Sequence, residues 1–213
     1  MYLMPHIVLL GDSIFDNAGY TAAGPDLISQ VRKLLPGGWH ATLLAIDGAT
    51  TDDIAAQLQR VPTDASRLVL SVGGNDALMN SNILHTPVES SSQVLGELAD
   101  ISRIFEKDYR VAVQGCRELR LPLTLCTIYN GCFVDPGLQR SISTALMVFN
   151  DVIIRVGVEL GLTVIDLRFV CSSPADFANP IEPSSCGGAK MARVIVNTLS
   201  IPAQNNVARL VIS

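Results

Sequence analysis

The sequence lacks the features that mark zinc-binding, redox and nucleic-acid-binding proteins. Its five cysteines are an odd number, and none has the paired CxxC spacing of a zinc or redox site. Basic residues are few, since 15 Lys and Arg stand against 20 Asp and Glu. This balance argues against nucleic acid or an anionic membrane as a partner and favours a small substrate. We expect mostly buried free thiols, with a disulfide left open, at Cys116, Cys126, Cys132, Cys171 and Cys186.

The beginning of the chain has no basic segment and no cleavage site of a signal peptide. The apolar run from Ile7 to Leu10 is too short to cross a membrane, so we expect a cytoplasmic protein without a membrane partner. We find no internal repeat, low-complexity tract or linker. With 213 residues, 48 % of them hydrophobic, the chain can bury one large core, and residues 1–213 are predicted to form a single domain.

Short apolar runs alternate with stretches of helical periodicity along the chain. The run at 7–10 is apolar throughout, which is typical of a strand buried on both faces. Similar runs lie at 41–46, 68–72, 121–126 and 162–165. Helical periodicity is found at 25–35, 51–58, 91–119, 138–160 and 184–199. This alternation predicts a parallel five-stranded sheet covered by helices on both sides, an α/β fold.

Glycine and polar residues follow three successive strands, at 11–14, 46–50 and 72–76. Ligands of open parallel sheets bind beyond the carboxyl ends of the strands. There Ser13 can act as a nucleophile, Gly48 allows a backbone N–H to approach an oxyanion, and the Asn75 amide can donate a second hydrogen bond. Each motif alone is also typical of an ordinary turn. Their coincidence at three strand ends favours a catalytic site.

The motifs Gly11-Asp12-Ser13, Gly48 and Gly73-Gly74-Asn75-Asp76 resemble the conserved blocks of the SGNH hydrolases, also called GDSL esterases and lipases. The resemblance covers nearly the whole chain. It implies a flavodoxin-like three-layer α/β/α sandwich, no cofactor, and hydrolysis of a small acyl ester through an acyl-serine intermediate. It also implies an oxyanion hole formed by the backbone N–H of Ser13 together with Gly48 and Asn75.

The last block of the family, Asp-x-x-His-Pro before the final helix, is altered in this chain. Glu182 stands in the place of the histidine and Asn179 in the place of the aspartate, and no histidine follows His85. Our first hypothesis is that Glu182 accepts the proton of the serine, as a carboxylate can when burial raises its pKa. Asp176 or Asn179 would then orient Glu182.

Two alternatives stay open. In the first, His85 folds over the site from the polar loop after the third strand, although a surface role is the simpler interpretation. His6, at the opposite end of the sheet, and His40, before the second strand, are interpreted as structural or solvated. In the second, the site is catalytically weak or inactive, and the same donors bind a carbonyl or carboxylate ligand.

Several other side chains have a simpler structural interpretation. The carboxylates Asp12, Asp16 and Asp47 suggest an oxygen-ligand metal site, but ordinary charged turns explain them, and we predict no metal; Asp12 is kept as a supporting residue. Asp166 follows the fifth strand, where it can belong to the rim of the crevice, cap a helix or pair with Arg168. Two further predictions are close packing of the last helix at Gly187-Gly188 and a core cluster of Met147, Phe149 and Val152.

Overall fold

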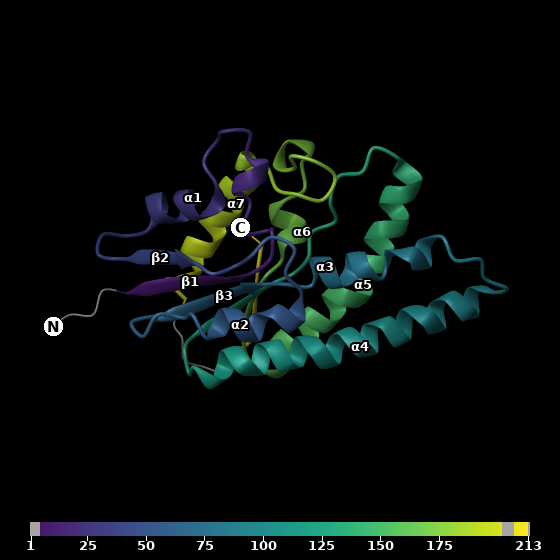
Figure 1. Cartoon of the computed structure of the whole chain (residues 1–213), viewed down its shortest axis with the longest axis horizontal. Helices are drawn as coiled ribbons and strands as arrows, with labels where there is room; N and C mark the ends of the chain where they lie inside the picture. The colour runs from purple at the N-terminus through teal and green to yellow at the C-terminus, as the bar shows by residue number, and fades with distance from the viewer. Residues whose placement is uncertain (1–4, 202–206, 213) are drawn as a thin grey trace.

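A computed structural model describes residues 5–201 and 207–212. Six parallel strands form one sheet in the order β2-β1-β3-β4-β5-β6 (Figure 1). Because the sheet is parallel, the carboxyl ends of neighbouring strands share one edge. The strands are β1 (His6–Gly11), β2 (His40–Leu43), β3 (Arg67–Ser71), β4 (Leu123–Cys126), β5 (Thr163–Ile165) and β6 (Arg209–Val211).

The sheet has one strand more than the five predicted. The additional strand, β6, pairs in parallel with β5 at the edge of the sheet. It has three residues, none of them buried, and Leu210 at its centre is 54 % exposed. An edge strand with one open face and so few residues lacks the long apolar run that marks a buried strand, so the prediction of five strands was wrong here.

Helices cover both faces of the sheet, which confirms the three-layer α/β/α prediction (Figure 1). The helices α1 (Leu27–Leu34), α6 (Leu167–Val170) and α7 (Ser185–Thr198) pack on one face. On the other face lie α2 (Ile54–Leu58), α4 (Ser91–Glu118) and α5 (Pro136–Glu159). Short helices at the carboxyl edge and in the loops are η1 (Ala18–Tyr20), η2 (Thr51–Asp53), α3 (Gly74–Met79), η3 (Ser81–Leu84) and η4 (Pro174–Asp176).

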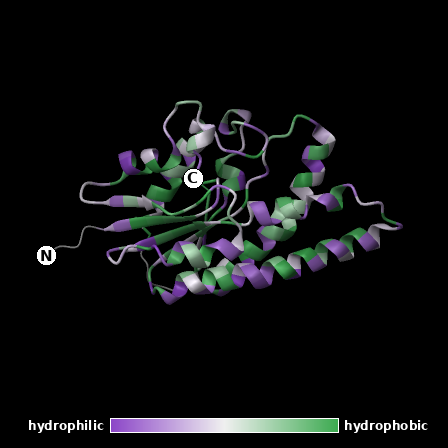
Figure 2. Ribbon diagram, in the orientation of Figure 1, coloured by the Kyte–Doolittle hydropathy of each residue, from purple (hydrophilic) through white to green (hydrophobic). Residues whose placement is uncertain are grey.

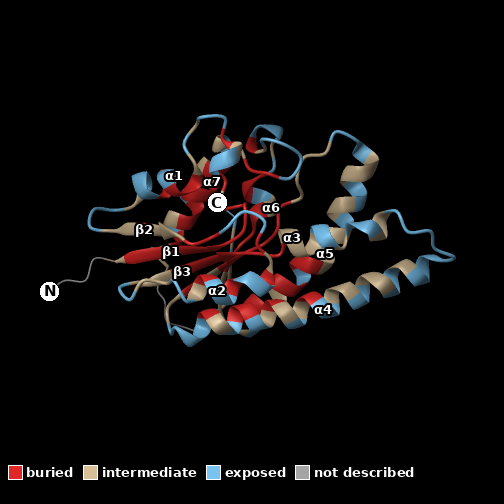
Figure 3. Cartoon of the chain, viewed as in Figure 1, coloured by how far each residue is buried: buried red, intermediate tan, exposed pale blue. Residues whose placement is uncertain are grey.

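The strand β1 shows why the central strands are apolar throughout. Ile7 and Leu9 belong to the core beneath α1 and α7, whereas Val8 and Leu10 belong to the core beneath α4 and α5. Successive side chains of a strand point to opposite faces, so a strand covered on both sides needs apolar residues at every position. The strand β1 is accordingly mostly green in Figure 2 and red in Figure 3, whereas the half-buried strand β2 is tan in Figure 3.

The two longest helices, α4 and α5, run side by side, and α5 continues past the sheet toward the carboxyl edge (Figure 1). Glu106 of α4 pairs with Arg155 of α5 at 2.8 Å, and Arg110 of α4 pairs with Glu159 of α5 at 2.7 Å, so two ion pairs join the helices. By length and hydropathy α5 is able to cross a membrane, and a third of its most apolar window is buried. Here α5 also packs against β4 and β5, so core packing accounts for part of this apolar character.

The predicted core cluster is confirmed for two of its three members. Phe149 and Val152 are buried in the core beneath α4 and α5, whereas Met147 is 59 % exposed, so placing Met147 in the core was wrong. Phe149 and Val152 are three residues apart and share one face of α5. Met147 lies two residues before Phe149, a rotation of about 200°, and faces away.

The remaining structural predictions hold where the structure describes them. A side chain at Gly187 would overlap the backbone oxygen of Asp176, so the close packing at the start of α7 is confirmed. The buried Asp166 caps α6 and pairs with Arg168 at 2.5 Å. All five cysteines are free; three are buried, Cys132 is half-buried and Cys186 is exposed.

Candidate active site

Two buried hydrogen bonds fix the strand end that precedes Ser13. The Gln57 side chain accepts from Gly11 N at 2.8 Å and donates to Gly11 O at 2.7 Å. Gly11 has φ +132°, and a Cβ there would overlap the backbone oxygen of Ser71, so this tight passage requires glycine. Asp12 then accepts from Ile14 N at 3.1 Å and closes the turn that presents Ser13.

Glu182 lies against the predicted nucleophile. Ser13 Oγ donates a hydrogen bond to Glu182 Oε1 at 3.2 Å, although the two residues are 169 positions apart in the sequence. The side chains are nearly closed off from solvent, since Ser13 is 7 % and Glu182 8 % exposed. The structure therefore places a carboxylate acceptor on the serine hydroxyl.

The loop that carries Glu182 is held by its own hydrogen bonds. Asn179 Oδ1 accepts from Ile181 N at 3.0 Å and from Glu182 N at 2.9 Å. Glu182 O accepts from Ala178 N at 2.8 Å, and the Tyr129 hydroxyl donates to Ile181 O at 2.6 Å. These bonds fix the backbone of Glu182 from both sides.

Of the two residues proposed to orient Glu182, Asn179 contacts its backbone and Asp176 does not. Asp176 Oδ2 accepts from Lys190 Nζ at 2.8 Å and from two backbone N–H groups, at Ser172 and Ser173. Within the described residues Ser13 is the sole hydrogen-bond partner of the Glu182 carboxylate, whose Oε2 is buried without one. Asp176 thus anchors the loop to α7, and the carboxylate is oriented by burial and by the serine.

A second side chain at the end of β1 anchors the same loop. Asn17 is fully buried; its Oδ1 accepts from Leu27 N at 2.8 Å and its Nδ2 donates to Pro183 O at 3.3 Å. The bond to Pro183 joins the first strand-end loop to the residue after Glu182. Neither Asn17 nor Gln57 was singled out in the sequence, since a bond between distant segments leaves no local pattern.

Burial changes the ionisation of two carboxyl groups in this site. It raises the pKa of Glu182 above its ordinary value of 4.5, an effect that the Ser13 hydrogen bond opposes and the charge of Asp47 reinforces. Burial also raises the pKa of Asp12 from 3.8 to about 8, opposed by the Ile14 N–H and reinforced by the charges of Glu182 and Asp76. At neutral pH Asp12 is therefore mostly protonated.

The predicted oxyanion donors lie at the carboxyl edge of the sheet. In the described part of the chain the backbone N–H groups of Ser13 and Gly48 have no hydrogen-bond acceptor. Asn75 Nδ2 donates to Ala49 O at 2.9 Å, which uses one of its two amide hydrogens and joins the second and third strand-end loops. Asp76 strengthens this junction by accepting from Thr51 Oγ1 at 2.6 Å.

A cavity of about 670 Å³ opens beside Ser13, Asn75 and Glu182. The predicted donor Gly48 is not part of its lining, but its neighbour Ala49 is bonded to Asn75. His85, the alternative base, does line the cavity; it is exposed, and within the described residues it has no hydrogen bond to Ser13. The apolar and aromatic lining residues are Ile14, Tyr20, Ala77, Leu78, Ile83, Leu84, Leu98, Ile101, Ile128, Tyr129, Phe133, Leu138, Ile142, Ala145, Leu146, Phe149, Pro180 and Ile181.

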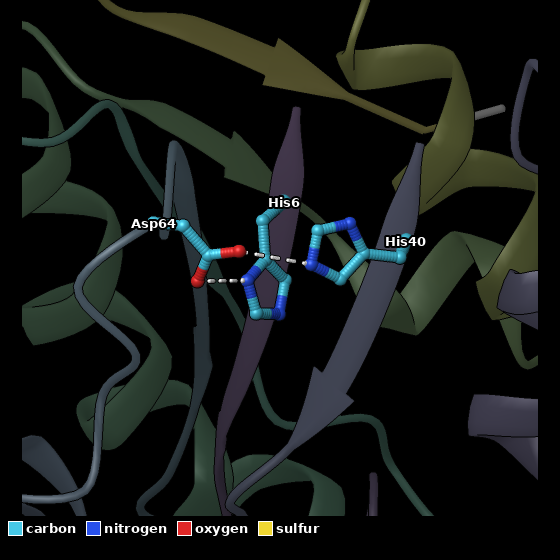
Figure 4. A group of neighbouring side chains, drawn as sticks. All are labelled: His6, His40 and Asp64. Atoms are coloured by element: carbon cyan, nitrogen blue, oxygen red, sulfur yellow. Dashed lines mark hydrogen bonds and ion pairs between the residues drawn. The ribbon is translucent and has the colours of Figure 1, made fainter. Parts of the chain in front are cut away.

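The other two histidines begin neighbouring strands at the amino end of the sheet, His6 as predicted and His40 as the first residue of β2 and not before it. His6 Nδ1 lies 3.0 Å from one oxygen of Asp64 and His40 Nε2 lies 3.3 Å from the other, with the two rings stacked at 3.8 Å (Figure 4). His6 Nε2 contacts Thr42 Oγ1 at 2.8 Å. The ligand atoms of these three residues lie within 4.8 Å of one another, close enough to hold a metal ion. An imidazole N–H donated to Asp64 from each ring accounts for the arrangement without one.

The carboxylates Asp16 and Asp47 accept hydrogen bonds across two loops and not within their own turns, so the interpretation as ordinary charged turns was wrong for these two. Asp16 Oδ2 accepts from Asp47 N at 3.1 Å, and Asp47 Oδ2 accepts from the Tyr20 hydroxyl at 2.7 Å. This contact is the main reason why the pKa of Tyr20 rises to about 12. The two carboxylates thus link the first and second strand-end loops.

The fold and the site define a GDSL-type hydrolase: a parallel α/β sandwich with a serine at the end of β1 and an acidic partner before the last helix. The GDSL-like lipase/acylhydrolase family matches residues 9–184, and the chain belongs to this family. No curated protein matches the chain.

Solved structures of lipases and esterases share the fold. An extracellular lipase from Streptomyces rimosus is 16 % identical with a TM-score of 0.68, over 92 % of this chain and 99 % of that one. A lipase from a goat rumen metagenome is 20 % identical with a TM-score of 0.66, over 88 % and 94 %. The acetyl xylan esterase AlAXEase is 17 % identical with a TM-score of 0.66, over 91 % and 99 %.

Proposed function

We propose that this chain is a serine-dependent ester hydrolase in which Ser13 is the nucleophile and Glu182 the general base. One observation carries the proposal: the buried hydrogen bond from Ser13 Oγ to Glu182 Oε1, 3.2 Å long. A general base must lie within hydrogen-bond reach of the proton that it removes, and Glu182 meets this condition. Its raised pKa supports the role, because a more basic carboxylate accepts a hydroxyl proton more readily.

The reaction consists of two acyl transfers. Ser13 Oγ attacks the ester carbonyl while its proton passes to Glu182 Oε1, which gives a tetrahedral oxyanion. The bond to the alcohol oxygen breaks as Glu182 returns the proton to that oxygen, and the acyl group stays on Ser13. Water then attacks the acyl-serine, with its proton passing to Glu182 and on to Ser13 Oγ, and the carboxylic acid is released.

The oxyanion would be stabilised by three donors: the N–H groups of Ser13 and Gly48 and the second amide hydrogen of Asn75. Support comes from the absence of acceptors for the two backbone donors in the described part of the chain. The bond from Asn75 to Ala49 O holds the amide in place before the substrate arrives. Donors that are already oriented lower the free energy of the transition state more than donors that must reorient.

The alternative of an inactive binding module is not favoured, because it rested on the missing histidine. Glu182 occupies that position and accepts from the serine hydroxyl. His85 is exposed and has no such bond within the described residues.

The test compares the hydrolysis of p-nitrophenyl butyrate by the wild type, Ser13→Ala, Glu182→Gln and the exposed control Glu89→Gln. We expect Ser13→Ala to abolish turnover and Glu182→Gln to lower kcat about 10²- to 10⁴-fold, the usual effect of losing a general base. Glutamine has the shape of glutamate, so thermal unfolding of Glu182→Gln should confirm a folded protein. Wild-type turnover by Glu182→Gln would exclude Glu182 as the base, and wild-type turnover by Ser13→Ala would exclude the acyl-serine.

A further inference from the structure

The cavity beside Ser13 is far larger than the small acyl group predicted from the sequence requires. It has a volume of about 670 Å³, within the range of sites that enclose whole organic ligands. At about 30 Å³ for each group the size of a water molecule, the cavity holds well over ten non-hydrogen atoms. An acetyl group would leave most of it empty.

One wall of the cavity is a stripe of apolar side chains along the outer half of α5. The lining residues Leu138, Ile142, Ala145, Leu146 and Phe149 recur at intervals of four, three, one and three, so they share one face of the helix. The stripe ends at Phe149, which is buried in the core. The apolar face of α5 therefore runs from the core directly into the cavity wall.

The opposite side of the cavity is built from the segments that follow β3. Ile83 and Leu84 of η3 and Leu98 and Ile101 of α4 face it. None of these side chains is fully buried, so the protein leaves apolar surface uncovered along the length of the cavity. Uncovered apolar surface in a half-open cavity of this size favours an apolar occupant.

The charged groups of the lining are confined to the catalytic end. Its two carboxyl groups, Asp12 and Glu182, flank Ser13, and no lysine or arginine belongs to the lining among the described residues. An anionic head group would find no lysine or arginine in the lining, where the exposed imidazole of His85 is the one basic side chain among the described residues, whereas a hydrocarbon chain would meet many apolar side chains. The chemistry of the lining thus favours an uncharged apolar chain attached to the ester at Ser13.

We propose that this cavity binds a hydrocarbon chain of about eight carbons or more in the ester substrate, with the carbonyl carbon at Ser13. The proposal rests on the proposed function of Ser13 and specifies its substrate class. The hydrocarbon chain can belong to the acyl group or to the alcohol group of the ester, since both have the same chemistry. Two series of esters distinguish these possibilities. One series is p-nitrophenyl esters from acetate to decanoate, and the other is alkyl acetates from ethyl to decyl.

Chain length is the first readout, with every substrate kept below its critical micelle concentration. In the series whose chain enters the cavity, kcat/KM should rise about fourfold with each added CH2 until the cavity is full, the gain expected from burying one CH2. A flat or falling kcat/KM from two to eight carbons in both series would overturn the proposal.

A cavity-filling variant tests whether the dependence of kcat/KM on chain length arises from the α5 wall. Ala145→Phe adds a ring in the middle of the stripe, and Ala99→Phe adds the same ring at an exposed position of α4 outside the lining. We expect Ala145→Phe to lower kcat/KM for the eight-carbon ester at least tenfold and to leave the acetate ester within about twofold, since each excluded CH2 loses about fourfold. Ala99→Phe should change neither. An equal loss on both esters by Ala145→Phe would contradict the assignment of the wall.

A binding experiment keeps this inference separate from the proposed function. Titration of Ser13→Ala with methyl nonyl ketone, which has an uncharged chain and no scissile bond, should give saturable heat, whereas acetone should give none. Binding of this ketone without ester hydrolysis by the wild type would support the cavity and refute the catalytic proposal. Hydrolysis of the acetate ester without ketone binding would support the catalytic proposal and refute the proposed binding of a hydrocarbon chain in the cavity.

Discussion

Replacing Asp12 with asparagine tests whether this buried carboxyl group is protonated in the folded protein. Asp12 is 1 % exposed, its Oδ1 accepts from Ile14 N at 3.1 Å, and its Oδ2 has no hydrogen-bond partner in the described part of the chain. Asparagine has the same shape and keeps an oxygen for the Ile14 bond. The variant therefore removes the ionisable proton and changes little else.

The size of the effect follows from the shift in pKa. Burial raises the pKa of Asp12 from 3.8 in the unfolded chain to about 8 in the folded protein. The contribution of protonated Asp12 to the free energy of unfolding is complete below pH 3.8, the pKa in the unfolded chain. It is lost as the pH rises through the pKa of about 8 in the folded protein. Between pH 5 and pH 7 the unfolded chain has released this proton and the folded protein keeps it, so the free energy of unfolding falls by about 1.4 kcal/mol per pH unit. Between pH 5 and pH 7 Asp12 therefore lowers the free energy of unfolding of the wild type by about 2 to 3 kcal/mol.

Urea unfolding of the wild type, Asp12→Asn and Glu89→Gln at pH 5, 6 and 7 measures this loss. Between pH 5 and pH 7 the free energy of unfolding should fall by about 2 to 3 kcal/mol less in Asp12→Asn than in the wild type. In the exposed control Glu89→Gln it should fall as much as in the wild type. The difference between variants cancels the other titrating groups. Parallel curves for Asp12→Asn and the wild type would show that Asp12 is already ionised at pH 5, and the assignment of a neutral carboxyl would fail.

Two further substitutions test the oxyanion donors and the packing of α7. Asn75→Ala removes a proposed oxyanion donor, so kcat for p-nitrophenyl butyrate should fall about 10²- to 10³-fold with KM nearly unchanged. A kcat within threefold of wild type would show that Asn75 is not an oxyanion donor. Gly187→Ala places a methyl group against Asp176 O and should lower the free energy of unfolding by about 1 to 3 kcal/mol. Gly96→Ala, in an exposed and open position of α4, should instead raise it by up to about 1 kcal/mol in the same urea titration. A lower free energy of unfolding in both Gly187→Ala and Gly96→Ala would show that the overlap with Asp176 O is not the cause of the destabilisation.

The strand-end residues of the site could be predicted because each follows a local pattern. An apolar run that ends in glycine places Ser13 at the end of β1, and the same pattern places Asn75 after β3. The parallel sheet then brings these ends to one edge. Glu182 was found by its position before the last helix, so its place beside Ser13 depended on the resemblance to a family and not on a pattern in its own segment.

The anchors and the cavity could not be predicted, for a physical reason. Gln57 fixes Gly11 across 46 residues, and Asn17 reaches Pro183 across 166, so neither bond leaves a trace in its own segment. The apolar stripe on α5 has the same helical period whether it faces a core or a cavity. Only the placement of η3 and α4 opposite it decides that this stripe lines an open space.

The charge of the site is compatible with the proposed role of Glu182 as base at the position of the family's histidine. A neutral histidine base leaves the oxyanion as the new negative charge, whereas a glutamate base is itself negative before the serine proton arrives. With Asp12 protonated, Glu182 is the one negatively charged carboxylate of the cavity lining among the described residues, and its charge would be neutralised as the oxyanion forms. Ionisation of Asp12 near pH 8 adds a second negative charge beside the oxyanion, so kcat/KM should rise above the ordinary glutamate pKa of 4.5 and fall again near pH 8. In Asp12→Asn the alkaline fall should disappear while the acid limb stays.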